Sequence, residues 1–144
     1  MSNPANDRVG PRHKVLVADD DKAMLHAISV RLESLGYDVV QAEDAYQAYA
    51  LALQDRGREE VVRRDVLLLD VHLPAGDGFS IQKRLAQSDD FDPASVIYIT
   101  GSVREDVEPV ARDLEAHGVL FKPFCSADLA AAVRDAVGPR APAG

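Results

Sequence analysis

The chain has 144 residues, a formal net charge of −8 and an apolar fraction of 47%, which is typical of one soluble globular domain. The acidic balance argues against a surface that binds nucleic-acid phosphates but is compatible with cations or basic partners. The single cysteine, Cys125, excludes an internal disulfide framework, and neither a membrane span nor a signal peptide is recognisable, so we expect a cytoplasmic protein.

Short apolar runs alternate with amphipathic stretches along the chain, between a predicted flexible tail at residues 1–12 and another at 139–144. The runs predict five strands, which are residues 14–18, 37–42, 65–69, 95–100 and 118–121. Strands this short and this apolar are typical of a parallel sheet that is covered on both faces.

The stretches between these strands have helical spacing of their apolar residues. The marker residues of the predicted helices are, in chain order, Met24 to Leu35, Ala45 to Leu53, Ile81 with Leu85, Val110 with Leu114, and Leu129 with Val133 and Val137. Gly36, Gly118 and Gly138 are the predicted stops of the first, fourth and fifth helices. Alternating strands and helices predict parallel βαβ units, right-handed crossovers and a doubly wound α/β fold.

Polar residues follow several of the predicted strands. They are Asp19-Asp20-Asp21, Asp70, Thr100-Gly101-Ser102 and Lys122-Pro123. In a parallel sheet these positions share one edge, where ligands bind. Asp21 is better interpreted as the N-cap of the first helix.

Such a group of side chains suits phosphoryl chemistry. Carboxylates that lie close together repel one another unless a cation joins them, and Mg²⁺ prefers oxygen ligands. An aspartate can be the nucleophile toward a phosphoryl group. A lysine and a hydroxyl would then neutralise and hydrogen-bond the phosphoryl oxygens.

Four motifs resemble those of the receiver domains of two-component response regulators, with the spacing usual for that family. They are "VLVADDD" (15–21), "LLLDVHLPAGDGF" (67–79), "VIYITG" (96–101) and "LFKPF" (120–124). The resemblance covers residues 13–138 as one receiver domain. It implies a (βα)5 fold with a five-stranded parallel sheet of strand order 2-1-3-4-5, which is flavodoxin-like or CheY-like.

The resemblance also implies a role for each matching residue. Asp70 is the expected phosphoacceptor. The expected Mg²⁺ ligands are Asp20 and Asp70 directly, Asp19 through water, and the backbone carbonyl of His72. The residues expected to bind the phosphoryl group are Thr100, Gly101 and Lys122. Those expected to shape the site are Pro74, Gly76, Gly78 and Pro123, the last after a cis peptide bond.

The partners that this resemblance implies are a histidine kinase or a histidine phosphotransfer protein, and a downstream protein target. It implies no direct contact with nucleic acid or membrane, a possible homodimer through the fourth and fifth helices, and no catalysis beyond the protein's own phosphorylation and dephosphorylation. A single-domain response regulator is the favoured interpretation, and a receiver fragment of a larger regulator or hybrid histidine kinase is the alternative.

Three features depart from the family pattern. Residues 54–64 are predicted to contain an insertion. Val119 stands where receivers usually carry an aromatic ring. Pro109 is tolerated only in the first turn of a helix, so the fourth helix is predicted to begin near Glu108. We therefore expect a switch based on residues 102–107 rather than on a ring flip.

Three rival functions are open at this point. A flavodoxin-like electron carrier needs a phosphate-binding loop where this chain has three aspartates. A phosphatase of the haloacid dehalogenase type needs an acid two residues after its nucleophile, where this chain has His72. The third rival is a pseudo-receiver, which would bind partners without phosphate.

Overall fold

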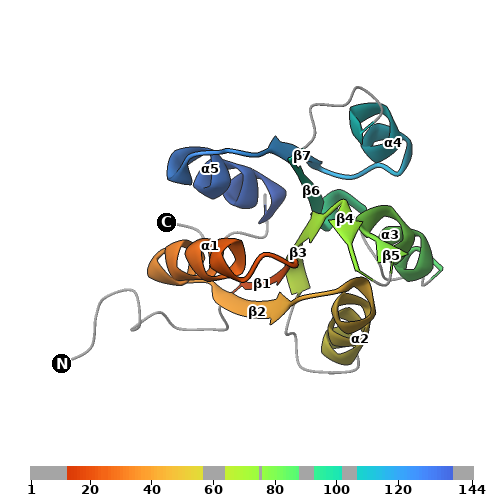
Figure 1. Cartoon of the computed structure of the whole chain (residues 1–144), viewed down its shortest axis with the longest axis horizontal. Coiled ribbons are helices and arrows are strands. Elements are labelled where there is room, and N and C mark those ends of the chain that lie inside the picture. Colours follow the sequence, from red (N-terminus) through yellow and green to blue (C-terminus); the bar gives the residue numbers. More distant parts are fainter. Residues whose placement is uncertain (1–12, 57–63, 75, 88–92, 102–106, 138–144) are drawn as a thin grey trace.

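The computed structural model describes residues 13–56, 64–74, 76–87, 93–101 and 107–137. The predicted tails lie outside these ranges, as do residues 57–63 of the predicted insertion. Figure 1 shows a central sheet with helices on both of its sides.

The sheet has the predicted strand order. Its five strands are β2 (Asp38–Ala42), β1 (Lys14–Ala18), β3 (Arg64–Asp70), β6 (Val96–Thr100) and β7 (Gly118–Phe121), in that spatial order and all parallel. In chain order this is 2-1-3-4-5, because β4 (His72–Leu73) and β5 (Gly76–Asp77) form a separate antiparallel hairpin. The hairpin was not predicted, and the five long strands agree with the prediction to within one residue at each end.

The helices divide between the two faces of the sheet. Their bounds are α1 (Lys22–Ser34), α2 (Ala45–Arg56), α3 (Gly78–Leu85), α4 (Val107–Asp113) and α5 (Ser126–Val137). Helices α1 and α5 cover one face, while α2, α3 and α4 cover the other (Figure 1). None of the helices in the described ranges is long and apolar enough to cross a membrane.

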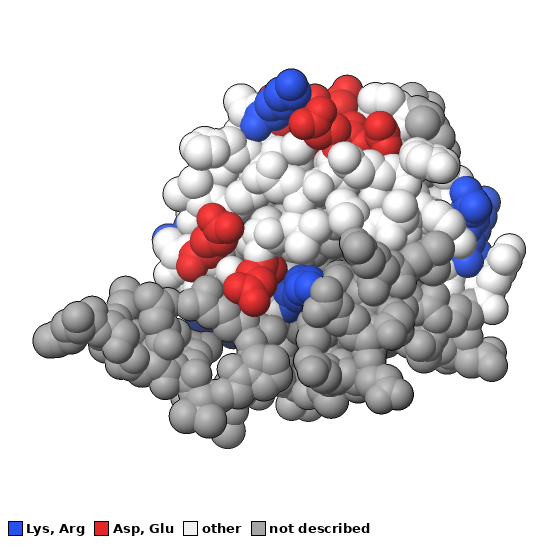
Figure 2. Space-filling model, turned by 90° about the horizontal axis from the view of Figure 1, so that it is seen from below, with Lys and Arg blue, Asp and Glu red and all other residues white. Residues whose placement is uncertain are grey.

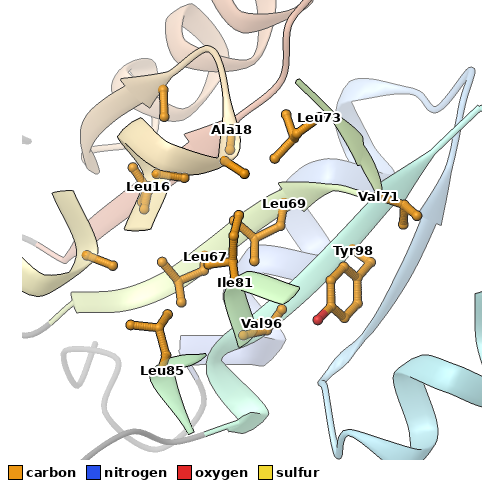
Figure 3. Packing of buried hydrophobic residues seen from close by; sticks show 14 of the residues in the cluster. Leu16, Ala18, Leu67, Leu69, Val71, Leu73, Ile81, Leu85, Val96 and Tyr98 are labelled. Atoms are coloured by element: carbon orange, nitrogen blue, oxygen red, sulfur yellow. The ribbon is translucent and has the colours of Figure 1, made fainter. Parts of the chain in front are cut away.

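The period-two alternation of a strand explains how each central strand contributes to both layers. Val66 and Leu68 of β3 pack with α1 and α5. Leu67 and Leu69 pack with the second layer, which Figure 3 shows from close by. All four side chains are fully buried. Burial of such a side chain stabilises the fold by about 1.5–3 kcal/mol.

Helix α4 begins near its predicted start but ends before its predicted stop. It begins at Val107, next to Glu108, so that Pro109 lies in its first turn as expected. It ends at Asp113, and Gly118 is not its stop but the first residue of β7. The chain leaves the helix at Glu115, which has a positive φ of 63°. The predicted switch loop falls mainly on residues 102–106, which lie outside the described ranges.

Candidate functional site

The pairing of β1 with β3 brings two acids to the carboxyl edge of the sheet. Ala18 is paired with Leu69, and each is followed by an aspartate. Asp19 is fully buried, and its backbone N–H donates to the carbonyl of Ala42 over 3.1 Å. Asp70 ends β3 and is 5% exposed. Two carboxylates therefore lie together at an edge where each is largely withdrawn from solvent.

The pairing of β6 with β7 places Lys122 beside these acids. Thr100 is paired with Phe121, and the next residue, Lys122, donates its backbone N–H to the carbonyl of Thr100 over 2.7 Å. The Lys122 ammonium nitrogen lies 2.8 Å from Oδ2 of Asp19 and 3.1 Å from Oδ2 of Asp70. One ammonium thus joins the two buried carboxylates.

Asp20 completes the acidic group, and Asp21 stands apart from it. One carboxylate oxygen each from Asp19, Asp20 and Asp70 lies within 4.8 Å of the others. Asp20 is exposed, so the group opens to solvent on its side. Asp21 caps α1, since its Oδ1 accepts hydrogen bonds from the backbone N–H groups of Ala23 and Met24. This confirms its interpretation as an N-cap.

The donor set of this group fits a divalent cation. Three carboxylates carry more negative charge than the single ammonium neutralises. Hard oxygen donors at this spacing suit Mg²⁺, which binds through one or two carboxylates and keeps several waters. The three carboxylates present therefore fit a Mg²⁺ ion.

The surroundings shift the pKa of both partners in the buried ion pair. Burial raises the pKa of the Asp70 carboxyl above 3.8, although hydrogen bonds from the His72 N–H and from Lys122 oppose the rise, and the charge of Asp19 adds to it. Burial lowers the pKa of Lys122, but the hydrogen bonds to Asp19 and Asp70 outweigh it, so the net pKa lies above 10.5. Lys122 is therefore a cation, and the charged form of Asp70 gains from any added positive charge.

The β4–β5 hairpin holds the segment after Asp70 in place. The backbone N–H of His72 donates to Oδ1 of Asp70 over 2.8 Å, while the His72 side chain is exposed. The carbonyl of Pro74 accepts a hydrogen bond from the N–H of Ala45, the first residue of α2 (3.0 Å). Neither the hairpin nor its contact with α2 was predicted from the sequence.

Gly78 lies so close to Asp70 that a side chain cannot fit. A Cβ at this position would lie 2.7 Å from the backbone oxygen of Asp70 and 3.2 Å from the Tyr98 ring. The Gly78 N–H donates to the carbonyl of Val71 over 3.1 Å. The glycine was predicted to shape the site, and close backbone contact is the physical reason for it.

Thr100, Gly101 and Pro123 lie at the same edge. Thr100 ends β6 and is fully buried, while Gly101 is exposed. A Cβ at Gly101 would meet the Lys122 side chain at 3.8 Å, an ordinary contact. The peptide bond between Lys122 and Pro123 is cis, as expected.

Tyr98 and Gln82 form a buried polar pair that sequence reasoning did not identify. Tyr98 lies within the strand predicted at residues 95–100, and it is fully buried. Its hydroxyl is hydrogen-bonded to the side chain of Gln82, which is 1% exposed. The available signal was that Gln82 follows Ile81 directly and precedes Leu85 by three residues, which places a polar side chain beside the apolar stripe of α3.

On the side of the molecule that Figure 2 shows, charged side chains of one sign do not form a large continuous patch. Lysine and arginine side chains are scattered there among acidic and uncharged ones, and a blue side chain lies beside a red group at the upper edge. The described part of this side therefore offers no continuous basic stripe of the kind that nucleic-acid surfaces carry.

The chain matches the family model described as "Response regulator receiver domain" over residues 15–134. It is 33% identical over 123 residues to the DNA-binding dual master transcriptional regulator RpaA of Synechocystis sp., a match that covers 84% of this chain and 47% of that protein. It is 31% identical over 121 residues to the alkaline phosphatase synthesis transcriptional regulatory protein PhoP of Bacillus subtilis, with the same two coverages. The chain spans about half the length of these curated relatives.

Solved structures show the same fold. A response regulator receiver domain protein from Clostridium thermocellum has a TM-score of 0.77 at 26% identity, and the match covers 89% of this chain and 96% of that one. The chemotaxis response regulator CheY4 of Vibrio cholerae has a TM-score of 0.73 at 27% identity, with coverages of 87% and 98%.

Proposed function

Because the chain belongs to the family of response regulator receiver domains in two-component signalling, we propose that it accepts a phosphoryl group on Asp70 and passes the signal to a protein partner by a change of conformation. One observation supports this most. The Lys122 ammonium lies 2.8 Å from Asp19 and 3.1 Å from Asp70, at the edge of the sheet where the acidic group opens to solvent. Positive charge is thus fixed where phosphoryl oxygens would arrive.

In the proposed reaction, a carboxylate oxygen of Asp70 attacks the phosphorus atom of a phosphohistidine. An O–P bond forms while the P–N bond breaks, and the leaving imidazole nitrogen keeps the electron pair of that bond. Lys122 neutralises a phosphoryl oxygen, and the Thr100 hydroxyl donates a hydrogen bond to another. Gly101 leaves the approach to Lys122 open. The hairpin keeps Asp70 in position through the His72 N–H.

The proposed metal ligands are the carboxylates of Asp19, Asp20 and Asp70 with the backbone carbonyl of His72. When bound, Mg²⁺ supplies positive charge that stabilises the transferring phosphoryl group. Lys122 holds Asp19 at the bottom of the site through a 2.8 Å hydrogen bond, while the exposed Asp20 faces solvent. Pro74, Gly78 and Pro123 shape the backbone around these groups.

Receiver domains are signalling proteins rather than classical enzymes. We propose that residues 13–138 form the receiver domain, that its phosphodonor is a histidine kinase or a histidine phosphotransfer protein, and that its only catalysis is its own phosphorylation and dephosphorylation. This domain would signal to a downstream protein and, by its acidic charge, avoid direct contact with nucleic acid. Homodimer formation through α4 and α5 is part of the proposal, as is the alternative that the domain belongs to a larger regulator.

Intact-mass spectrometry after addition of a small phosphodonor tests this function. Wild-type protein should gain one phosphoryl group with Mg²⁺ and none in a chelator. Asp70→Asn should gain none. Asp21→Asn is the matched control, because Asp21 is an aspartate of the same edge that caps α1 and lies outside the acidic group. Equal labelling of wild type and Asp70→Asn would contradict the proposal.

A further inference from the structure

Gln82 of α3 and Tyr98 of β6 place two polar side chains inside the apolar layer between the sheet and α2, α3 and α4. Their exposed fractions are 1% and 0%. Figure 3 shows Tyr98 beside aliphatic side chains of this layer, with its oxygen in red. Burial of polar groups costs free energy unless they are hydrogen-bonded. The hydrogen-bond partners of Tyr98 and Gln82 therefore show which parts of the structure the two side chains connect.

The Tyr98 hydroxyl lies within reach of two acceptors. One is Oε1 of Gln82, and the other is the backbone carbonyl of Gly78 at 3.4 Å. A hydroxyl has one hydrogen, so a full hydrogen bond to one acceptor weakens the bond to the other. Nε2 of Gln82 in turn donates to the carbonyl of Leu114 over 2.8 Å. The pair thus has two alternative arrangements and connects two distant segments.

One end of this series of hydrogen bonds lies next to Asp70 at the end of β3, and the other end lies at the carboxyl end of α4. Gly78 lies against the backbone oxygen of Asp70, where even a Cβ would come within 2.7 Å. Leu114 directly follows α4, whose last carbonyls have no partners within the helix. Gln82 therefore supplies a partner at the end of a helix of seven residues. Three hydrogen bonds in series thus join the carbonyl of Gly78 to the carbonyl of Leu114.

We propose that Tyr98 and Gln82 are a relay that couples the backbone around Asp70 to the carboxyl end of α4. This inference rests on the proposed function. In the resting state Tyr98 donates to Gln82, which holds Leu114. When phosphorylation shifts Gly78 toward the hydroxyl, Tyr98 donates to Gly78, and Gln82 releases Leu114. Val119 is the residue paired with Tyr98 across β6 and β7. The relay runs through Tyr98 and Gln82, so it does not require an aromatic side chain at position 119.

The backbone carbonyl ¹³C chemical shifts of Gly78 and Leu114, whose oxygens accept the hydrogen bonds at the two ends of the relay, test it in the resting protein without any phosphoryl group. Tyr98→Phe keeps the ring contact with Phe79 but removes the hydroxyl. Both carbonyl signals should then move upfield, because the Gly78 carbonyl loses its donor and Gln82 loses the contact that positions it on Leu114. Gln82→Met should move the Leu114 signal upfield but the Gly78 signal downfield, because the hydroxyl then donates to the Gly78 carbonyl alone.

The control is Ser29→Ala, which removes the 2.7 Å hydrogen bond between Gln41 and Ser29 on the other side of the sheet. It should change neither carbonyl signal. If Tyr98→Phe changes the Gly78 carbonyl signal alone, or neither signal, the two ends are not coupled and the relay is wrong.

A second arm adds the phosphodonor and Mg²⁺ to wild type and Tyr98→Phe, with labelling measured by intact mass. Labelling of both proteins with a change of the Leu114 carbonyl signal in wild type alone supports the relay. The same change in both proteins overturns it. Failure of wild type to label overturns the proposed function, and the carbonyl signals of the resting proteins then decide the relay by themselves.

Discussion

Asp70 is buried, but positive charge can reach its carboxylate from two directions. Lys122 contacts one of its carboxylate oxygens. A metal cation would approach from the other direction, through the side of the acidic group that opens to solvent at Asp20. Burial raises its pKa, and the negative charge of Asp19 contributes to the rise. A buried carboxylate without a bound cation lowers the stability of the fold. Neutralising its charge removes most of this cost.

The first prediction concerns this cost. An acid whose pKa is higher in the folded than in the unfolded state binds protons more tightly when folded. Its contribution to stability therefore falls as pH rises from the unfolded value, near 3.8, through the higher folded value. In a chelator at neutral pH, Asp70→Asn should raise the midpoint of thermal unfolding above that of wild type. The difference should vanish below pH 3.8, and a lower midpoint for the variant at pH 7 would contradict the account.

The second prediction concerns the ion pair. Lys122→Met leaves the fully buried carboxylate of Asp19 without its cation. Because the lysine is 21% exposed, we expect a loss of about 1–3 kcal/mol in the free energy of unfolding rather than the larger cost of a fully buried pair. Urea unfolding in a chelator measures it, and added Mg²⁺ should restore part of the loss. Lys22→Met, at an exposed lysine in the first turn of α1, is the control.

At the scale of single residues, the sequence was most informative where a polar residue directly follows an apolar strand. Asp19, Asp70 and Lys122 were predicted at one edge of the sheet, and the structure brings their side chains together. The Tyr98–Gln82 bond was not predicted, because it joins residues 16 positions apart on different elements. The apolar pattern places Tyr98 in a buried strand and Gln82 beside the apolar stripe of α3, but it does not indicate that the two side chains meet.

Among the elements, the hairpin after Asp70 and the end of α4 depend most on local backbone geometry. The hairpin passes through Gly76, whose φ of 142° is a conformation that other residues rarely adopt. It then reaches Gly78, which lies against the backbone oxygen of Asp70 at the end of β3. The turn residues of this segment were evident in the sequence, but two strands of two residues each are too short for a periodic signal.

The third prediction tests the contact at Gly78. Gly78→Ala would place a Cβ 2.7 Å from the backbone oxygen of Asp70, so the backbone must move. We expect a loss of about 1–3 kcal/mol in the free energy of unfolding, as for other overpacked sites. Gly118→Ala is the matched control, because a Cβ there meets nothing within 4 Å. Equal stability of the two variants, measured by urea unfolding, would refute the close contact.

The fourth prediction concerns the end of α4. Glu115 adopts a φ of 63°, which is unfavourable for a residue with a side chain, and the residue is exposed. Glu115→Gly should therefore raise the free energy of unfolding by about 0.5–1 kcal/mol. Glu108→Gly, in the first turn of the same helix, should lower it by up to about 1 kcal/mol. A loss of stability at both positions would show that Glu115 is not strained.

The whole molecule is a parallel sheet whose strand ends meet at one edge, and this determines how much was predictable. Five apolar runs alternating with helical stretches, together with the family resemblance, were sufficient for the fold and the strand order. The predicted end of α4 at Gly118 was wrong. The chain turns at Glu115, a non-glycine residue whose positive φ has no signal in the sequence. Val119 and Pro109 indicated an altered switch, and residues 102–106, on which that hypothesis depends, lie outside the described ranges.

The central claim of this account is that Asp70 carries the phosphoryl group. A phosphorylated aspartate is an acyl phosphate, which borohydride reduces to the alcohol homoserine at the labelled position. After treatment with a small phosphodonor, Mg²⁺ and borohydride, peptide mapping should find homoserine at position 70 and intact aspartate at Asp19, Asp20 and Asp21. Homoserine at one of those three positions instead, or at none in a protein that has gained a phosphoryl group, would contradict the account.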